Sequence, residues 1–225
     1  MKLYDQVIFG EFVDRPNRFI ANVITERGME RCHVKNTGRC AELLVRGARV
    51  TLSVSGKEER KTRCDLVAVQ KGDRYINMDS QAPNRAAQEA MGQIFPGLTL
   101  LRPETVYGAS RFDFYLEQGD KRSFVEVKGV TLEKNGAVLF PDAPTARGAK
   151  HVRELASCVQ NGLGACLLFV VQMRDVEYLS PNWDTDPEFS SALRDARDAG
   201  VQIMAYDCLV TPDGMALRRP VEIRL

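Results

Sequence analysis

Two short segments with alternating apolar and polar residues constrain the fold of this chain more than any other feature. Residues 111–116 read RFDFYL and residues 123–128 read SFVEVK, with a polar, glycine-containing turn between them. Successive side chains of a β-strand point to opposite faces, so each segment predicts a strand with one apolar face. The short turn, centred on Gly119 and Asp120, predicts that the two strands pair as a hairpin.

This hairpin would bring two carboxylates together. Asp113 lies directly opposite Glu126 in that register, and Lys128 shares their face. Directly opposed residues have Cβ atoms roughly 4.5–5.5 Å apart, where like charges repel. A divalent cation between the carboxylates, with Lys128 beside it, would remove the repulsion, since Mg²⁺ is typically held by one or two carboxylates and several waters. The hairpin therefore predicts a Mg²⁺ or Mn²⁺ site with Asp113 and Glu126 as its protein ligands.

Two other interpretations of the hairpin stay open. An ion pair between Glu126 and Lys128 on a solvated strand face explains the same residues. A three-residue turn would shift the strand register by one and place the two carboxylates on opposite faces. The hairpin alone does not distinguish between these interpretations. Evidence from the rest of the sequence is needed.

Composition and charge indicate a globular protein of ordinary type. The 225 residues suffice for one large domain or two small ones, and 44% hydrophobic with 27% charged residues is typical of such proteins. The first residues lack the basic start and apolar run of a signal peptide, and no run of about 18 apolar residues predicts a membrane span. Six cysteines without a C-x-x-C pair disfavour zinc ribbons and thioredoxin-like chemistry. We expect a cytoplasmic protein with reduced cysteines and no membrane partner.

Residues 1–80 predict a small β-barrel. Strands are expected at 7–13, 18–25, 29–34, 48–54 and 63–69, with a short helix at 39–44 between the third and fourth. This is the element order of an OB-fold, which often binds single-stranded nucleic acid or oligosaccharide. The segment carries 15 Lys and Arg against 11 Asp and Glu, whereas the rest of the chain carries 16 against 19. A basic nucleic-acid-binding module followed by a carboxylate-bearing domain fits this distribution.

Residues 81–225 predict a mixed α/β domain. Helices are expected from Pro83, from the N-cap Thr145 to about 161, and after Pro187; strands are expected near 98–107, in the hairpin, and at 165–171 and 201–206. That order predicts a mixed sheet with helices packed on it, so the fold class is α/β (α+β). The second helix carries Arg147, Lys150 and Glu154 in one polar stripe, and the first carries Glu89 on a polar side.

The element order, with Asp on the second strand of this domain and Glu-x-Lys on the third, resembles the PD-(D/E)xK nuclease core. Longer motifs resemble the sugar fermentation stimulation protein A (SfsA) family: RFDF from 111, VEVKGV from 125, LFPDAPTARGAKH from 139, FVVQ from 169, RFIA from 18, HVKNTG from 33 and APNR from 82. The resemblance covers nearly the whole chain. It implies an OB-like N-terminal domain, a nuclease-like C-terminal domain, DNA binding and a link to sugar metabolism, without implying catalysis.

One motif departs from its usual family form. That form has Pro before the Asn and Ser-Met after the Gly, where this chain has Lys35, Arg39 and Cys40. The variant loop is more basic, which favours phosphate contacts. The departure weakens any transfer of individual binding roles to this loop.

The site hypothesis follows from the residues. Asp113 and Glu126 would hold the cation, and Lys128 would orient or deprotonate the attacking water and stabilise the developing charge. The supporting candidates are Glu89, Lys150 and Glu154, for which a solvated helix residue and a surface ion pair are the alternatives. The residues expected to contact the DNA backbone are Arg15, Arg18, Lys35, Asn36, Arg39 and Arg147, whose alternative role is to keep the surface soluble. His151, next to Lys150, fits a packed or capping role as well as a functional one.

Three functions remain open at this point. The first is a DNA-binding protein, largely without sequence preference, that has a Mg²⁺- or Mn²⁺-dependent phosphodiesterase site. The second is a non-catalytic DNA-binding regulator of sugar (maltose-type) metabolism that keeps the nuclease fold as a scaffold. A binder of sugars or metabolites through the OB-fold is suggested only by the family name.

Overall fold

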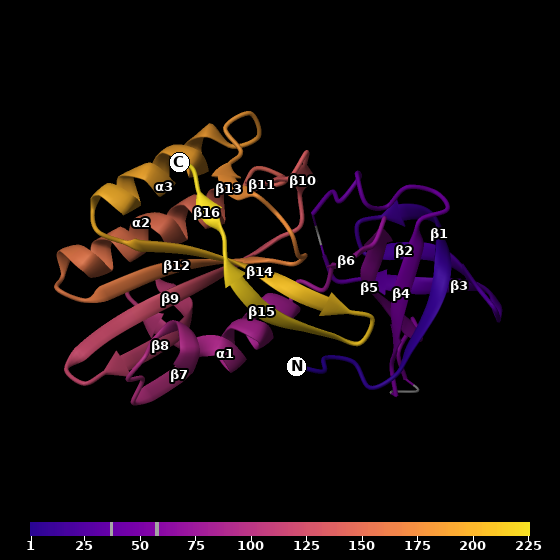
Figure 1. Ribbon diagram of the computed structural model, residues 1–225, viewed down its shortest axis with the longest axis horizontal. Coiled ribbons are helices and arrows are strands. Elements are labelled where there is room, and N and C mark those ends of the chain that lie inside the picture. The colour runs from indigo at the N-terminus through magenta and orange to yellow at the C-terminus, as the bar shows by residue number, and fades with distance from the viewer. Residues whose placement is uncertain (37, 57–58) are drawn as a thin grey trace.

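The computed structural model describes residues 1–36, 38–56 and 59–225. An all-β N-terminal domain and a mixed α/β C-terminal domain lie side by side along its longest axis (Figure 1). The chain passes between them through residues 78–81, from the end of the last barrel strand to the start of the first helix. A domain boundary after residue 80 stays a prediction.

The N-terminal domain is a closed β-barrel. Its strands are β1 (Val7–Asn17), β2 (Ile20–Thr25), β3 (Gly28–Val34), β4 (Arg49–Val54), β5 (Cys64–Lys71) and β6 (Arg74–Asn77), in the order β3-β2-β1-β4-β5-β6. Parallel pairing of β3 with β5 closes the barrel. Inward-pointing side chains of small or medium size fill it, among them Ala21, Val23, Cys32, Leu52 and Leu66, all fully buried. The five expected strands are confirmed, and β6 is an additional short one.

The helix expected at 39–44 is wrong. The backbone N–H groups of Leu43 and Leu44 both donate to the carbonyl of Cys40, which makes one turn and no helix. Cys40 has a φ of 47°, in the left-handed region, so an α-helix cannot run through this residue.

The C-terminal domain is built on a six-stranded mixed sheet. The strands are β7 (Leu100–Tyr107), β8 (Ser110–Gln118), β9 (Lys121–Val130), β12 (Gly164–Val171), β14 (Gln202–Thr211) and β15 (Gly214–Pro220), in the order β15-β14-β12-β9-β8-β7. The central strands β9, β12 and β14 are parallel, and antiparallel strands flank them. The apolar run in β12 is buried on both faces, as a central parallel strand requires.

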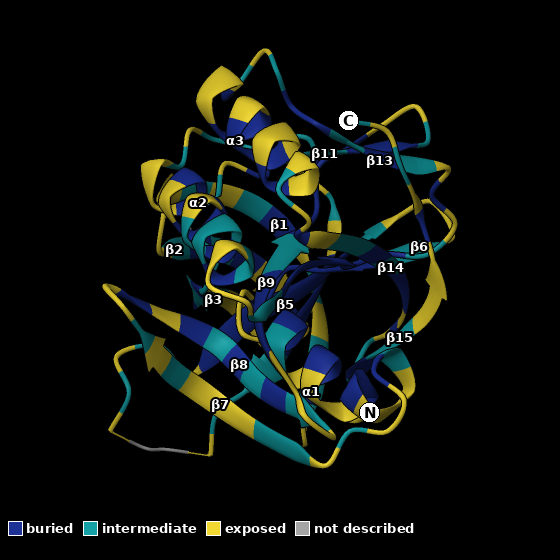
Figure 2. Cartoon of the chain, turned by 90° about the vertical axis from the view of Figure 1, so that its left-hand side faces the viewer, coloured by how far each residue is buried: buried dark blue, intermediate teal, exposed yellow. Residues whose placement is uncertain are grey.

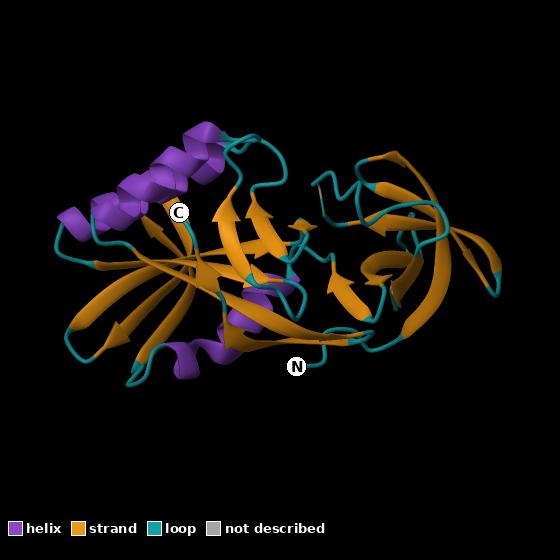
Figure 3. Ribbon diagram, turned by 45° about the horizontal axis from the view of Figure 1, so that its top comes forward, coloured by secondary structure: helices purple, strands orange, loops and turns teal. Residues whose placement is uncertain are grey.

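Three helices cover the two faces of this sheet. Helices α2 (Ala146–Gln160) and α3 (Pro187–Asp198) pack against one face, and α1 (Ala82–Ile94) packs against the other (Figures 1 and 3). Leu167 and Phe169 of β12 point toward α2 and α3, whereas Leu168 and Val170 point toward α1. Figure 2 shows the inner sides of α2 and α3 buried and their outer sides exposed, which is the amphipathic pattern of surface helices.

A second, smaller sheet lies beside the ends of these helices. It consists of β10 (Glu133–Lys134), β11 (Ala137–Phe140), β13 (Tyr178–Pro181) and β16 (Glu222–Ile223). Each strand has only two to four residues, too few for a recognisable alternation, so the sequence did not predict them.

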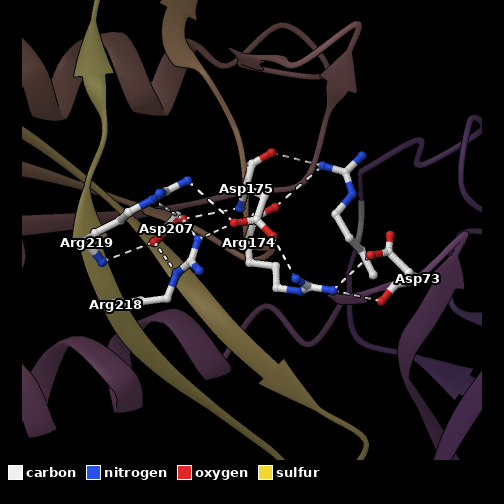
Figure 4. A network of polar contacts seen from close by, with 7 residues as sticks. Asp73, Arg174, Asp175, Asp207, Arg218 and Arg219 are labelled. Atoms are coloured by element: carbon white, nitrogen blue, oxygen red, sulfur yellow. Dashed lines mark hydrogen bonds and ion pairs between the residues drawn. The ribbon is translucent and has the colours of Figure 1, made fainter.

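Polar contacts, some buried and some exposed, join the two domains. The side-chain amide nitrogen of Gln172 donates to the carbonyl oxygens of Asn77 and Asp79 at 3.1 and 3.2 Å, and the N–H of Asn77 donates to the carbonyl of Gln172. Lys71 of the barrel pairs with buried Glu133 at 2.8 Å. Arg174 pairs with Asp73 of the barrel at 3.1 Å, at one end of a larger network of Arg and Asp residues (Figure 4).

Within the described part of the chain, no helix is long and apolar enough to span a bilayer. All six cysteines are described, buried and free.

Candidate metal centre

The candidate centre lies where β8 and β9 separate. The antiparallel ladder starts at Gln118 opposite Lys121 and its last pair is Phe114 with Val125, which confirms the predicted register over five pairs. Beyond that pair β8 stays with β7 and β9 stays with β12, so the two strands diverge. Asp113 is the first residue of β8 past the fork, so the predicted direct pairing of Asp113 with Glu126 is not part of the ladder.

The divergence changes which way β8 faces. Phe112 packs with Phe124 on the α2 side of the sheet, with ring centroids 5.3 Å apart, whereas Phe114 and Leu116 pack on the α1 side. Strict alternation in residues 111–116 would place Phe112 on the same face as Phe114 and Leu116; this prediction is wrong, because it assumes a regular strand. Asp113, between the two orientations, extends toward β9.

Two donors hold the Asp113 carboxylate. The backbone N–H of Val127 donates to Oδ2 at 2.7 Å, and the side-chain amide of Asn84 donates to Oδ1 at 2.6 Å. Asn84 belongs to the first turn of α1, in which Pro83 is the second residue. Asp113 therefore joins β8, β9 and α1 at one point.

Glu126 of β9 is the second carboxylate, and it is almost fully buried, with 4% of its side chain exposed. Its Oε1 lies 2.5 Å from Nζ of Lys128 and 2.5 Å from Nδ1 of His151. Its Oε2 is also buried, and no donor among the described residues reaches it. An unpaired buried acceptor costs free energy, so this oxygen points to a ligand that the protein itself does not supply.

The two carboxylates interact electrostatically. Burial and, next, the nearby charge of Glu126 raise the pKa of Asp113 above its usual range. The hydrogen bonds from Val127 and Asn84 and the charge of Lys128 oppose this increase without cancelling it. A cation bound between the carboxylates would offset both the burial and the repulsion, and oxygen ligands of this kind suit Mg²⁺ or Mn²⁺.

Helix α2 supplies His151 to this centre. The helix begins at its expected N-cap, where Oγ1 of Thr145 accepts a hydrogen bond from the N–H of Gly148 at 3.0 Å. A Cβ atom on Gly148 would lie 2.7 Å from Thr145 Cγ2, so the close fit of the cap requires glycine. Two turns of the helix then place Arg147 and His151 on the side that faces Glu126.

The structure places the three supporting candidates away from the carboxylate pair. Lys150 donates to the carbonyl of Ala109 and lies 3.7 Å from Glu154, and Ser110 donates to Glu154. These two residues therefore attach the turn between β7 and β8 to α2. Glu89 is 51% exposed and pairs with the N-terminal ammonium group at 3.3 Å.

Two basic side chains of the barrel, those of Arg15 and Lys35, already contact acceptors within the protein. The guanidinium of Arg15 donates to four backbone carbonyls, those of Arg18, Asn36, Gly38 and Arg39, at 2.6–3.0 Å. Nζ of Lys35 lies 2.9 Å from Asp79 and 3.4 Å from Asp65. Both cations have internal partners, so burial and charge pairing limit their availability to a phosphate.

The asparagine loop contacts the C-terminal domain. Oδ1 of Asn36 accepts from the N–H of Gly38, and the N–H of Arg39 donates to Oδ2 of Asp142 at 3.1 Å. A Cβ on Gly38 would collide with the same carboxylate of Asp142, so glycine allows the close approach. Thr37 lies outside the described residues. The side chains of Arg39 and Arg18 are exposed, and the guanidinium of Arg18 lies over the Phe19 ring.

Comparison with known proteins places this geometry in a family. The family model described as "Sugar fermentation stimulation protein RE domain" matches residues 81–214, and the model described as "SfsA N-terminal OB domain" matches residues 13–78. The chain belongs to the sugar fermentation stimulation protein family. The SfsA models also confirm the expected order of an OB-like barrel followed by a nuclease-like domain.

Full-length relatives agree with this assignment. The chain is 50% identical over 224 residues to a sugar fermentation stimulation protein homolog of Ruminiclostridium cellulolyticum and 49% identical to one of Clostridium beijerinckii, in each case over 99% of both chains. A solved structure, that of Pyrococcus furiosus SfsA in complex with Ca²⁺, matches 100% of both chains with a TM-score of 0.89 at 24% sequence identity. That likeness confirms the SfsA fold over the full length.

Among the described residues, Asn84 and His151 are side chains that contact the two carboxylates and that the sequence did not assign to the centre. Both lie inside motifs that carried the family resemblance, APNR and LFPDAPTARGAKH. Their position in these motifs was the available signal, but only the folded chain shows that each contacts a carboxylate.

Proposed function

We propose that this protein is a DNA-binding phosphodiesterase whose divalent cation, Mg²⁺ or Mn²⁺, is held by Asp113 and Glu126. The observation that carries the proposal is Oε2 of Glu126, which is buried and lacks a donor in the described part of the chain, near the half-buried carboxylate of Asp113. Two acidic ligands at one fork of a nuclease-like sheet suit a cation that acts on a phosphodiester.

The cation and the residues around it have different roles in the proposed reaction. A bound divalent cation supplies Lewis-acid stabilisation of phosphoryl oxygens and a water of lowered pKa. Asn84 and the N–H of Val127 fix the orientation of Asp113, so little reorganisation is needed to bind the cation. Lys128 adds a positive charge at the same site, where it can stabilise charge that develops on the phosphoryl group or orient the attacking water.

Two further considerations support the proposal. The solved structure of the Pyrococcus furiosus relative is described as a complex with Ca²⁺, which fits a family site for divalent cations. On the barrel, Arg18 and Arg39 present exposed cationic side chains for the phosphate backbone, and Arg147 does so on α2. We propose that binding is largely independent of sequence and that the protein acts in the cytoplasm.

Cleavage of labelled DNA tests this function. The purified protein is incubated with single-stranded, duplex and branched DNA in Mn²⁺ or Mg²⁺, beside Glu126→Gln. We expect the wild-type protein to cleave at least one of these structures and Glu126→Gln to bind the same DNA without cleaving it. Glu89→Gln is the matched control, because this exposed carboxylate lies apart from the fork, and it should cleave normally.

The same assay separates the competing function. Binding that weakens with rising salt, without cleavage of any DNA structure in either metal, would reject the phosphodiesterase and favour a non-catalytic DNA-binding scaffold.

A further inference from the structure

The Glu126 carboxylate is held asymmetrically. Oε1 has two donors at 2.5 Å, Nζ of Lys128 and Nδ1 of His151, while Oε2 has none among residues 1–36, 38–56 and 59–225. A carboxylate held at one oxygen can rotate only a little about its Cγ–Cδ bond, so the direction of Oε2 is set by whatever holds Oε1. Lys128 reaches Oε1 from the same strand, and His151 reaches it from α2.

Of the two donors, His151 is the more constrained. Only 7% of its side chain is exposed, and its ring meets the edge of Phe112 at a centroid distance of 6.2 Å and an interplanar angle of 71°. The capped first turn of α2 fixes the backbone from which it projects. Lys128 instead has a long, flexible stem with three rotatable donors, which restrain a partner less tightly.

Arg147 contacts the ring nitrogen of His151 that faces away from Glu126. Nε of Arg147 lies 3.5 Å from Nε2 of His151, one helical turn away. A guanidinium can only donate, so Nε2 of the neutral ring accepts and the proton sits on Nδ1, toward Glu126. Arg147, His151 and Glu126 therefore form a chain of donors and acceptors with one direction.

We infer that His151 is a positioning residue for the metal ligand Glu126, and that Arg147 positions His151 in turn. This inference rests on the proposed function and assigns Arg147 a role besides phosphate contact. His151 holds Oε1 so that Oε2 stays aimed at the cation whether or not Lys128 remains on the carboxylate. Partners of this kind behind a metal ligand typically change metal affinity or activity by roughly 10–100-fold when removed.

Calorimetric titration of Mn²⁺ into the full-length protein tests the inference without measuring turnover. His151→Leu keeps an apolar side chain of similar size and removes the donor, so Mn²⁺ affinity should fall by roughly 10–100-fold. His151→Asn keeps an N–H donor near the position of Nδ1 and should recover most of that loss. Arg147→Met replaces a solvent-exposed side chain, so this variant should fold normally and weaken Mn²⁺ binding by a smaller factor.

Arg153→Met is the matched control on the same helix. Arg153 pairs with exposed Glu188 at 3.0 Å, outside the centre, and its replacement should leave Mn²⁺ affinity unchanged. Unchanged affinity in His151→Leu, or equal losses in His151→Leu and His151→Asn, would overturn the positioning role while leaving the proposed metal site intact. A wild-type protein that binds no Mn²⁺ would overturn both.

Discussion

Lys128→Met is expected to lower the rate of Mn²⁺-dependent DNA cleavage by roughly 10²–10³-fold while Mn²⁺ affinity is kept or increased. The rate falls because the variant loses the ammonium group that contacts Glu126 at the fork, and removal of one charge-stabilising donor typically costs this much. Methionine keeps the apolar length of the stem. Affinity is kept because both carboxylates remain and a competing positive charge has been removed.

Single-turnover cleavage and Mn²⁺ titration measure the two quantities separately. Lys150→Met is the control, because exposed Lys150 contacts Ala109 and Glu154 instead of the carboxylate pair, and we expect near-normal cleavage. If Lys128→Met lost Mn²⁺ affinity and kept its rate once saturated with metal, Lys128 would serve to assemble the site and not to stabilise charge.

Asp207→Asn is expected to destabilise the protein by about 3 kcal/mol, the loss typical of a buried acceptor of several charge-assisted hydrogen bonds. Asp207 is 0% exposed and accepts from the side chains of Arg218 and Arg219 and from the backbone N–H groups of Arg219 and Asp175 (Figure 4). For a chain of this size the expected fall in Tm is about 6–12 °C.

The pH dependence of this loss has a definite sign. Burial by itself raises the pKa of Asp207, but hydrogen bonds from Arg218 and from the backbone N–H groups of Arg219 and Asp175 outweigh it and lower the pKa. A carboxyl with a lowered pKa in the folded state stabilises the protein above its unfolded pKa, near 3.9, and this contribution disappears as pH falls through the folded value. The difference in Tm between wild type and variant should therefore shrink below about pH 4.

Asp175→Asn is the matched control in the same network. Asp175 pairs with Arg218 at 2.7 Å but is 42% exposed, so its replacement should cost only about 0–1 kcal/mol. Equal losses in Tm for the two variants would show that burial does not determine the strength of this network.

The sequence predicted features that depend on local pattern. Five barrel strands, the three helices and the hairpin register follow from alternation, helical spacing, and the cap at Thr145, and each is present. Glu126 and Lys128 were assigned to one face of β9, and they lie in contact there. These features depend on residues that are close together in the chain, so their pattern can be read from one sequence.

The features that the sequence did not predict depend on distant segments. Residue spacing shows neither the fork that turns Phe112 away from Phe114 nor the contacts of Asn84 and His151, because each needs two elements brought together by folding. Arg15 is a basic residue of the kind that binds phosphate. Its guanidinium, however, already donates to four backbone carbonyls of nearby loops. Charge on a loop indicates a possible phosphate contact only when no internal acceptor is within reach.

In the proposed centre, the buried carboxylate of Glu126 and the half-buried carboxylate of Asp113 repel each other at the fork, and a divalent cation relieves this repulsion. Because its folded pKa is raised, deprotonated Asp113 costs stability above that pKa, and the cost disappears as pH falls through it. Asp113→Asn removes the charge and keeps the shape of the side chain. The metal-free variant should therefore be more stable than wild type at neutral pH.

Thermal unfolding of wild type and Asp113→Asn, each with and without Mn²⁺, is the most direct test. We expect the variant to have the higher Tm without metal. With Mn²⁺ at about 100 times Kd, wild type should gain about 2.7 kcal/mol, roughly 5–10 °C, and the variant should gain nothing. A lower Tm for the metal-free variant, together with the same gain from Mn²⁺ in both proteins, would contradict a metal centre at Asp113 and Glu126.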